Sequence, residues 1–422
     1  MEPLSMSDPL PFLRRLFDRA VEVADPMRSL RHALPPKPEG RLVVVGAGKA
    51  SARMAEAVEA EYGPCEGVVI TRYGYARPCQ GIEIIEAAHP VPDTAGVEGT
   101  RQMLALLQSL GENDTVLALI SGGASALLLQ PAGDISLPEK QAINQALLAS
   151  GAPIGQMNTV RKHLSRVKGG QLAAAAYPAR MLALLISDVP GDDPTMIGSG
   201  PTVGDASTPA DARAILQKNG IALPGSVQKV LTGPCQVIAP GDERLTRVEN
   251  VIYAAPSQSL EAAAELARLE GIDVRMLGDA LEGEARDVAA TQASEALRLQ
   301  QEMTAGAPPI LLLSGGELTV TRTGDGIGGP NAEFALALAL ALRGAPGIHA
   351  IACDTDGVDG AAEVAGAVIG PETLAKGPDA ADALRCNDAH GFFDRIGGQV
   401  ITGPTLTNVN DFRAILIEPA QT

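Results

Sequence analysis

Two copies of a Ser-Gly-Gly tripeptide, each directly after a short apolar run, are well suited to hold an anion. Ser121-Gly122-Gly123 follows residues 117–120, and Ser314-Gly315-Gly316 follows residues 311–313. Paired glycines let a strand stop and turn sharply, and they allow backbone N–H groups to approach a ligand. A helix that starts there adds unpaired N–H groups, which favour negative charge. The two copies predict a phosphate or carboxylate site shared by two lobes.

Lys49 offers a cation for such a site. It lies in Gly46-Ala47-Gly48-Lys49-Ala50-Ser51, between a β-branched run and a predicted helix. The segment departs from the dinucleotide fingerprint because Ser51 replaces the third glycine, and from the Walker A motif because Ala50 replaces Ser or Thr. A lysine at this helix start would reinforce anion binding by the N–H groups. It could equally be a surface lysine after an ordinary strand-to-helix turn.

A dense basic block, MNTVRKHLSRVKGGQL, covers residues 157–172 of an otherwise acidic chain. On a continuous helix its polar side chains would form two neighbouring faces, one with Arg161, Ser165 and Lys168 and the other with Lys162 and Arg166. Such a run can be a solvated face that balances nearby acids. The glycine pair that follows and the acidic surroundings favour a cationic wall that faces a substrate.

Asp188, Asp192 and Asp193 lie in a long loop rich in Gly and Pro, directly after a predicted strand at 181–186. Ligands of open α/β sheets collect at the carboxyl ends of strands. These carboxylates could bind Mg²⁺ or accept a proton from a substrate hydroxyl. They could also cap helices and turns, and we expect at least one of the three to do only that.

Asp354 and Asp356 follow another predicted strand, at 348–353, and suit the same two roles. The spacing excludes an EF-hand, because Asp359 stands where that loop needs Gly and Ala365 where it needs Glu. A second candidate loop lies nearer the N-terminus. His89-Pro90-Val91-Pro92-Asp93 is predicted to be extended, since proline fixes the backbone. Its His and Asp could face a substrate or tie the loop down.

Composition bounds the fold class and the partners. A chain of 422 residues exceeds one ordinary core and predicts two α/β lobes. A net charge of -17 argues against nucleic-acid and anionic-membrane partners. The five scattered Cys lack CxxC spacing, which argues against disulfides and structural zinc. Residues 1–14 have no signal-like apolar core and no run is long enough to span a membrane, so we expect a soluble, cytoplasmic enzyme.

The elements that must position these residues follow a repeated α/β pattern. Residues 9–34 predict two short amphipathic helices, interrupted at Asp25-Pro26. Turn-rich composition over 203–246 marks a boundary, and the pattern restarts with a strand at Val248–Ala254. We therefore divide the chain into domains at 1–240 and 241–422.

The motifs together resemble the glycerate 2-kinase family, whose members carry a C-terminal lobe known as MOFRL. The resemblance runs from about Pro9 to the C-terminus, with all blocks in order: VVGAGKAS, HPVPD, LISGGASALL, MNTVRKHLSRVKGGQLA, SDVPGDDPTMIGSGPT, LLSGGELTVT, GGPNAEFALALAL, DTDGVDG and TGPTLTNVNDF. It implies a two-lobed α/β fold with an interdomain cleft. The large N-terminal domain would be a Rossmann-like α/β/α layer, and the smaller α/β domain would contain the MOFRL region at about 308–415.

The resemblance also implies a reaction, the ATP- and Mg²⁺-dependent phosphorylation of D-glycerate at its 2-hydroxyl to 2-phosphoglycerate and ADP. The essential lysine of the family falls on Lys49. Asp188 or Asp192 would orient the hydroxyl, and Asp188 and Asp354 are the candidate metal ligands. The substrate-binding candidates are Ser121, Gly122, Gly123, Ser125, Arg161 and Lys162. The nucleotide-binding candidates are Ser314, Gly315, Gly316, Glu317, Asn331 and Asp356, although the two glycine segments could also hold the two ligands the other way round.

One departure concerns the second lobe. Many members read GGRNQE where this chain reads GGPNAE, so Pro330 replaces a cation that the family uses. Arg322 or an arginine of the first lobe would then substitute, or phosphate would be bound differently. An NAD(P)H-dependent hydroxypyruvate reductase is the alternative function, weakened by Ser51 and by the poor ribose-binding candidate Glu66. A non-catalytic sugar-acid sensor is a third possibility, and the protein is expected to be a monomer or homodimer.

Overall fold

The computed structural model describes residues 8–420 and divides into two compact units, each with its own six-stranded sheet. The N-terminal unit comprises residues 26–188 and 192–254. The C-terminal unit comprises the described residues up to 25, then 189–191 and 255 onward. Part of the segment predicted to lack a signal-like core, residues 1–7, lies outside the described residues. Among the described residues, no helix combines the length and apolar character needed to cross a membrane.

The sheet of the N-terminal unit is entirely parallel, with the order β3-β2-β1-β4-β5-β6. This is the strand order of a Rossmann sheet, which confirms the predicted fold class. The order reverses between β1 and β4, where ligands of such sheets bind. The strands are β1 (Leu42–Ala47), β2 (Glu66–Arg72), β3 (Ile82–Ala87), β4 (Thr115–Ile120), β5 (Arg180–Ile186) and β6 (Val248–Ala254).

Two differences from the sequence-based division follow from strand pairing and helix packing. β6, assigned from sequence to the second lobe, pairs in parallel with β5 and forms the edge of the first sheet. The first helix, α1 (Pro9–Ala24), belongs to the C-terminal unit because its apolar face packs in the core of that unit. As predicted, this helix ends before Pro26, where a short second helix, α2 (Pro26–Ser29), begins.

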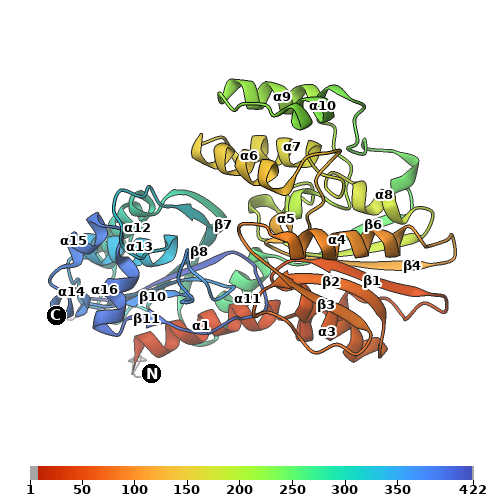
Figure 1. Cartoon of the computed structure of the whole chain (residues 1–422). Helices are drawn as coiled ribbons and strands as arrows, with labels where there is room; N and C mark the ends of the chain where they lie inside the picture. Colours follow the sequence, from red (N-terminus) through yellow and green to blue (C-terminus); the bar gives the residue numbers. More distant parts are fainter. Residues whose placement is uncertain (1–7, 421–422) are drawn as a thin grey trace. The chain divides into compact units, whose positions relative to one another are not determined.

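Helices cover both faces of the N-terminal sheet. α3 (Ser51–Tyr62) and α4 (Thr94–Leu107) lie on opposite faces (Figure 1). All six residues of β1 are buried, as expected for a parallel strand covered on both sides. The short helices α5 (Ala124–Leu127) and α8 (Gln171–Ala176) follow Gly123 and Gly170, respectively.

A separate helical layer with its own apolar core belongs to the same unit (Figure 1). Its helices are α6 (Leu137–Ala149), α7 (Ile154–His163), α9 (Pro209–Lys218) and α10 (Gly225–Thr232). The basic block does not form the continuous helix predicted for it, because α7 ends at His163. The backbone beyond it turns aside to pair with another segment: Ala132 N–H donates to Leu164 O at 3.2 Å, and Arg166 N–H donates to Gln130 O at 2.9 Å. The predicted faces that extended to Ser165 and beyond are therefore wrong.

The sheet of the C-terminal unit has the order β11-β10-β9-β12-β8-β7, and only β7 and β8 run parallel. β12 is not among the strands predicted from the sequence, although it lies between β9 and β8 within the sheet. Its sequence DFRAILI is buried at every position and lacks the alternation that marks a half-exposed strand. The strands are β7 (Asp273–Glu284), β8 (Ile310–Thr319), β9 (Ile348–Asp354), β10 (Gly366–Ile369), β11 (Gln399–Val400) and β12 (Asp411–Ile417).

Alternate residues of these strands feed two cores. Leu312 packs with α12 (Ala285–Glu302) and α13 (Pro330–Leu342), whereas Leu313 packs with α1 and α11 (Pro256–Leu269). α13 is buried along most of its length, which explains its run of Ala and Leu. The remaining short helices of the unit are α14 (Thr373–Lys376), α15 (Ala380–Arg385) and α16 (Ala389–Ile396).

The second Ser-Gly-Gly does not form the predicted turn. β8 continues through it to Thr319, and Ser314 pairs with Gly278 of β7 and with Arg413 of β12. Gly316 pairs with Leu281 of β7. The apolar run before the tripeptide and the first residues after it therefore belong to one continuous strand, and the turn expected at the paired glycines does not form.

The close approach of β7 and β8 predicts that Gly316→Ala is costly. Gly316 has a φ of +102°, and an added Cβ would collide with the backbone of Leu281. The left-handed backbone and the collision together should lower the free energy of unfolding by about 2 kcal/mol or more. Gly306→Ala is the matched control: its φ is +81°, but an added Cβ would meet nothing within 4 Å. Equal urea-denaturation midpoints for the two variants would contradict this account of the strand pair.

Candidate functional site

The turn after β1 and the first Ser-Gly-Gly after β4 are joined at the point where the strand order reverses. β1 and β4 are neighbours, with Ala47 beside Ile120. Lys49 N–H donates to Gly122 O at 2.8 Å, and Ala50 N–H donates to Ser121 Oγ at 3.0 Å. The two predicted motifs are therefore one structural feature at the carboxyl edge of the sheet.

Ser121 holds this feature together from inside. Its side chain is fully buried and lies 3.2 Å, Oγ to Oγ, from Ser51, which donates to Leu119 O at 2.9 Å. Ser51 N–H donates to Gly48 O at 3.2 Å. The N–H groups of Lys49, Ala50 and Ser51 are thus paired within the protein. Ser121, a predicted substrate-binding residue, positions the turn that carries Lys49.

Glycine is required at two positions here. Gly48 has a φ of +142°, and an added Cβ would collide with Ser121 Oγ. Gly123 has a φ of +83°, and an added Cβ would lie 3.2 Å from ring atoms of His89 and 3.2 Å from Lys49 Cγ. The Lys49 stem and the His89 ring therefore converge on Gly123.

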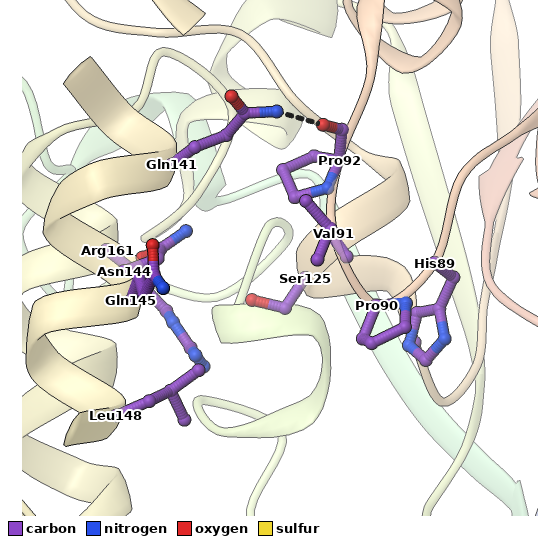
Figure 2. Close-up of a pocket in the computed structure, with 12 residues that line it drawn as sticks. His89, Pro90, Val91, Pro92, Ser125, Gln141, Asn144, Gln145, Leu148 and Arg161 are labelled. Atoms are coloured by element: carbon purple, nitrogen blue, oxygen red, sulfur yellow. Dashed lines mark hydrogen bonds between the residues drawn. The ribbon is translucent and has the colours of Figure 1, made fainter. Parts of the chain in front are cut away.

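A pocket of about 520 Å³ opens beside Gly123. Figure 2 shows the loop His89–Pro92 facing four side chains of α6, with Ser125 between them. Gln141 Nε2 donates to Pro92 O at 2.7 Å and ties α6 to the loop. Of the two loop residues considered from sequence, His89 lines the pocket. Asp93 ties the loop down, because its carboxylate accepts from Gly96 N–H at the start of α4.

Sequence reasoning found Gly123, Ser125 and Arg161 but missed the wall formed by α6. That wall consists of Gln141, Asn144, Gln145 and Leu148. Their spacing of three, four and seven residues places them on one helix face, a pattern that could have been read from the sequence. This mostly polar face belongs to a helix that also contributes Ile143 and Leu147 to an apolar core.

Arg161 is the cation that lines the pocket. Its Nη1 donates to Asn158 Oδ1 at 3.4 Å, and Ser199 Oγ donates to the same oxygen at 3.1 Å. Ser199 Oγ lies 2.7 Å from Ser125 Oγ, so α7, α5 and the Asp-rich loop are linked. Burial lowers the Arg161 pKa, but an arginine remains charged in proteins. Among residues 8–420, Arg161 forms no ion pair with a carboxylate.

Lys162, the other residue carried over from the basic block, does not line the pocket. Its Nζ lies 2.5 Å from Asp205 Oδ2, and the two side chains are only 5% and 14% exposed. Burial raises the pKa of the Asp205 carboxyl, but the hydrogen bonds from Lys162 and Ser207 outweigh burial, so the pKa lies below its ordinary value. The charge of Lys162, a predicted substrate-binding residue, is neutralised by Asp205 inside the protein.

The three Asp residues of the Asp-rich loop, Asp188, Asp192 and Asp193, have different surroundings. Asp193 Oδ1 accepts from Thr195 N–H at 2.9 Å, which fulfils the expectation that at least one carboxylate only caps a turn. Asp192 has a φ of +53°, and its buried Oδ1 has no hydrogen-bond partner among the described residues. Asp188 follows β5 at the carboxyl edge of the sheet. Across residues 8–420, no group of three or more His, Cys, Asp or Glu could hold a metal ion.

In the C-terminal unit, the Asp residues after β9 cap backbone. Asp354 Oδ1 accepts from Asp356 N–H at 2.9 Å, and Asp356 Oδ1 accepts from Val358 N–H at 2.7 Å. The Asp359 carboxylate accepts from the first N–H groups of α13, including Asn331 N–H at 2.9 Å. Of the predicted nucleotide set, Asn331 and Asp356 are thus buried in this network, whereas Glu317 is exposed.

Pro330 occupies the first position of α13, where proline suits a helix start. Arg322, a predicted substitute for the missing cation, is exposed and donates to Gly324 O and Gly326 O, both at 3.2 Å. Arg413 is a wholly buried arginine of this unit, and its Nη1 donates to Asp411 Oδ2 at 2.7 Å. The guanidinium groups of Arg322 and Arg413 are therefore both bound to their own unit.

Comparison with known proteins places the chain among relatives that cover nearly all of it. Residues 12–232 match the family model "Domain of unknown function (DUF4147)", and residues 310–411 match the MOFRL family model. A "Putative hydroxypyruvate reductase" of Agrobacterium vitis is 52% identical, covering 96% of this chain and 94% of that protein. A "D-glycerate 2-kinase" of Thermotoga maritima is 39% identical, covering 93% and 94%. The crystal structure of glycerate kinase from Thermotoga maritima matches with a TM-score of 0.86 at 38% identity, covering 97% and 99%.

The buried bond between Ser121 and Ala50 predicts a measurable loss in Ser121→Ala. The substitution leaves the buried Ala50 N–H without its acceptor, which should lower the free energy of unfolding by about 1–3 kcal/mol. Hydrogen exchange at the Ala50 amide should accelerate as well. Ser109→Ala is the control, because that hydroxyl is exposed, and water can replace its bonds to Leu106 O and from Arg41 Nη1. Unchanged Ala50 exchange in Ser121→Ala would rule out the positioning role.

Proposed function

The chain belongs to the glycerate 2-kinase family, and we propose that it transfers the γ-phosphoryl group of ATP to the 2-hydroxyl of D-glycerate. The similarity to proteins named glycerate 2-kinase over more than nine tenths of the chain supports a glycerate-directed kinase. The identity of the donor and the choice of hydroxyl are the parts of the proposal that need direct tests.

Arg161 is the residue that supports this function most directly. It is a cation without a carboxylate partner among the described residues, and it lines a pocket beside Lys49. An arginine can bind a carboxylate through two parallel hydrogen bonds, and such charge-assisted bonds are stronger than neutral ones. We assign the glycerate carboxylate to Arg161, with Ser125 beside it at the pocket floor. Lys49, whose stem passes Gly123, is then near the acceptor hydroxyl.

In the proposed step, a bond forms between the 2-oxygen of glycerate and the γ-phosphorus, and the bond from that phosphorus to the β,γ-bridging oxygen breaks. ADP leaves with the electron pair, and the hydroxyl proton passes to a carboxylate. Asp192 is our candidate acceptor because its buried Oδ1 lacks a hydrogen-bond partner in the described chain. Lys49 would stabilise the charge on the transferring phosphoryl group.

Mg²⁺ is proposed as the cofactor that neutralises the donor phosphates. Mg²⁺ usually keeps several waters and takes only one or two carboxylates besides the phosphates. The described chain has no cluster of three acidic ligands, and a site with one carboxylate fits that habit. Asp188, at the end of β5, is the residue we assign to it, with Asp354 as the second candidate. The nucleotide is assigned to the C-terminal unit, where Glu317 is the exposed member of the predicted set.

The reductase name of the Agrobacterium vitis relatives is the reason to test a second function. A dinucleotide site of the Rossmann type needs free N–H groups at the first helix start to hold the pyrophosphate. In this chain Ala50 N–H is taken by Ser121 Oγ and Lys49 N–H by Gly122 O. These internal bonds argue against a nicotinamide dinucleotide at that turn and favour the kinase.

Lys49→Ala should lower kcat for phosphorylation of D-glycerate by about 10²-fold or more, since it removes charge stabilisation at the transferring group. The assay combines purified protein, D-glycerate, ATP and Mg²⁺, and identifies the phosphoglycerate isomer by NMR. A parallel assay with hydroxypyruvate and NADH or NADPH tests the reductase. Lys218→Ala, an exposed lysine on α9, is the control. Near-normal turnover in Lys49→Ala would remove it from the mechanism, and nicotinamide oxidation without phosphoglycerate would overturn the kinase proposal.

Arg161→Met should raise the KM for D-glycerate by about tenfold or more while changing kcat less, because a bidentate ionic contact to the carboxylate is lost. Arg166→Met is a matched control, since this arginine belongs to the same basic block but is exposed and lies outside α7. A KM that is the same in both variants would show that the carboxylate is held elsewhere.

A further inference from the structure

Two lysines with almost no exposed surface belong to the segments that form the pocket. Lys140 precedes Gln141 on α6 and is 2% exposed, and Lys168 follows the end of α7 and is 1% exposed. Lys140 Nζ donates to Leu164 O at 2.6 Å. Lys168 Nζ donates to Ser125 O at 2.9 Å and to Leu128 O at 3.2 Å, so it holds the backbone of α5.

Neither lysine has a counter-charge in the described chain. Both donate only to backbone carbonyls, and no ion pair between residues 8 and 420 includes either of them. The charged group that acts on both is Arg161, which is also a cation. Burial, and then the charge of Arg161, lower the pKa of Lys140 from 10.5 to about 7. Burial, followed by the charges of Lys140 and Arg161, lowers the pKa of Lys168 well below its ordinary value.

The remaining charged groups around Lys140 are engaged with other partners. On its own helix, the Glu139 carboxylate accepts from Ser136 and Ser226. On α7, Lys162 is paired with Asp205, and His163 Nε2 lies 3.1 Å from Ser207 Oγ. Lys140, Lys168 and Arg161 therefore form a cluster of three basic side chains, and no carboxylate among residues 8–420 pairs with any of them.

We propose that this cluster sets the anion affinity of the pocket, with the carboxylate of the bound acid serving as its missing counter-charge. Lys140 and Lys168 are positioning residues: Lys168 holds the backbone of α5, which carries Ser125, and the charges of both lysines act on Arg161. The inference rests on the proposed function in so far as the pocket ligand is D-glycerate. It extends that function by assigning affinity to buried residues that do not touch the substrate.

The physical basis is the cost of an uncompensated buried charge. Taking a charged group out of water is unfavourable unless an opposite charge or strong hydrogen bonds replace the lost hydration. A lysine at position 140 that served packing alone would be replaced with advantage by an apolar side chain of similar shape. A bound carboxylate supplies the opposite charge, and in a site of low dielectric its attraction to the cluster is large.

The test is the variant Lys140→Met, which keeps the shape and removes the charge. Binding of D-glycerate is measured by titration calorimetry at pH 6 without nucleotide, so the result does not depend on turnover. We expect the Kd to rise about tenfold, and the thermal midpoint to stay unchanged or rise. Leu147→Ala, a fully buried apolar position on the same helix, is the control: it should lower the midpoint and leave the Kd unchanged.

The pH dependence separates a charge effect from a packing effect. Below about pH 7 Lys140 is protonated, so the wild-type Kd should be lowest there and should rise between pH 6 and pH 8. Because the pKa is depressed in the folded state, the unfolded chain binds more protons between about pH 7 and pH 10.5, and wild-type stability should rise with pH over that window. In Lys140→Met the pH dependence of both Kd and stability should be reduced.

The possible results separate a failure of the pocket assignment from a failure of the role given to Lys140. No binding of D-glycerate by the wild-type protein would overturn both the pocket assignment and this inference. Binding that is equally tight in the wild type and in Lys140→Met would overturn the inference alone and leave the proposed function standing. If Lys140→Met does not fold, Lys140→Gln, which removes the charge but keeps a hydrogen-bond donor for Leu164 O, is measured in its place with the same expected increase in Kd. A weaker Kd that comes with a fall in thermal midpoint like that of Leu147→Ala would assign Lys140 a packing role and also overturn the inference.

Discussion

The hydrogen bond from Ala50 N–H to Ser121 Oγ is the contact on which the candidate site depends. It joins the turns that follow β1 and β4, the two strands between which the sheet order reverses. Because this bond is buried, water cannot replace it if it breaks. The same contact uses up an N–H group that a dinucleotide site would leave open. This one hydrogen bond thus helps to fix the turn that carries Lys49 and argues against a dinucleotide at that turn.

Much of the N-terminal unit could be predicted from the sequence because its signals are local. Buried parallel strands are short apolar runs, and the strand predicted at 181–186 is observed as β5 with nearly the same bounds, Arg180–Ile186. Tertiary pairing is harder to anticipate. The second Ser-Gly-Gly has the same letters as the first, yet Leu281 and Arg413 pair on either side of it and keep it extended. A tripeptide does not specify which edges of a strand are already occupied.

The candidate site could be predicted only in part from the sequence. As with the second Ser-Gly-Gly, the differences come from contacts between segments that are distant in the chain. Arg161 was identified from the basic block, but Lys162 beside it faces Asp205, which is distant in sequence. The α6 residues that line the pocket are uncharged and include no glycine, so charged or glycine-rich motifs do not indicate them. The buried Lys140 was likewise missed, because a lysine on an amphipathic helix is normally assigned to the solvent face.

The arrangement of the C-terminal sheet constrains how the chain can fold during its synthesis. β12 lies between β9 and β8, so that sheet has a gap in its middle until residue 417 has left the ribosome. The core on one of its faces also includes α1, which precedes all six strands of that sheet in the chain. The N-terminal unit, by contrast, has all its strands once residue 254 has emerged. Synthesis from the N-terminus therefore favours early folding of the Rossmann-like sheet, whereas the core that α1 shares with α11 and β12 is complete only after β12 has been made.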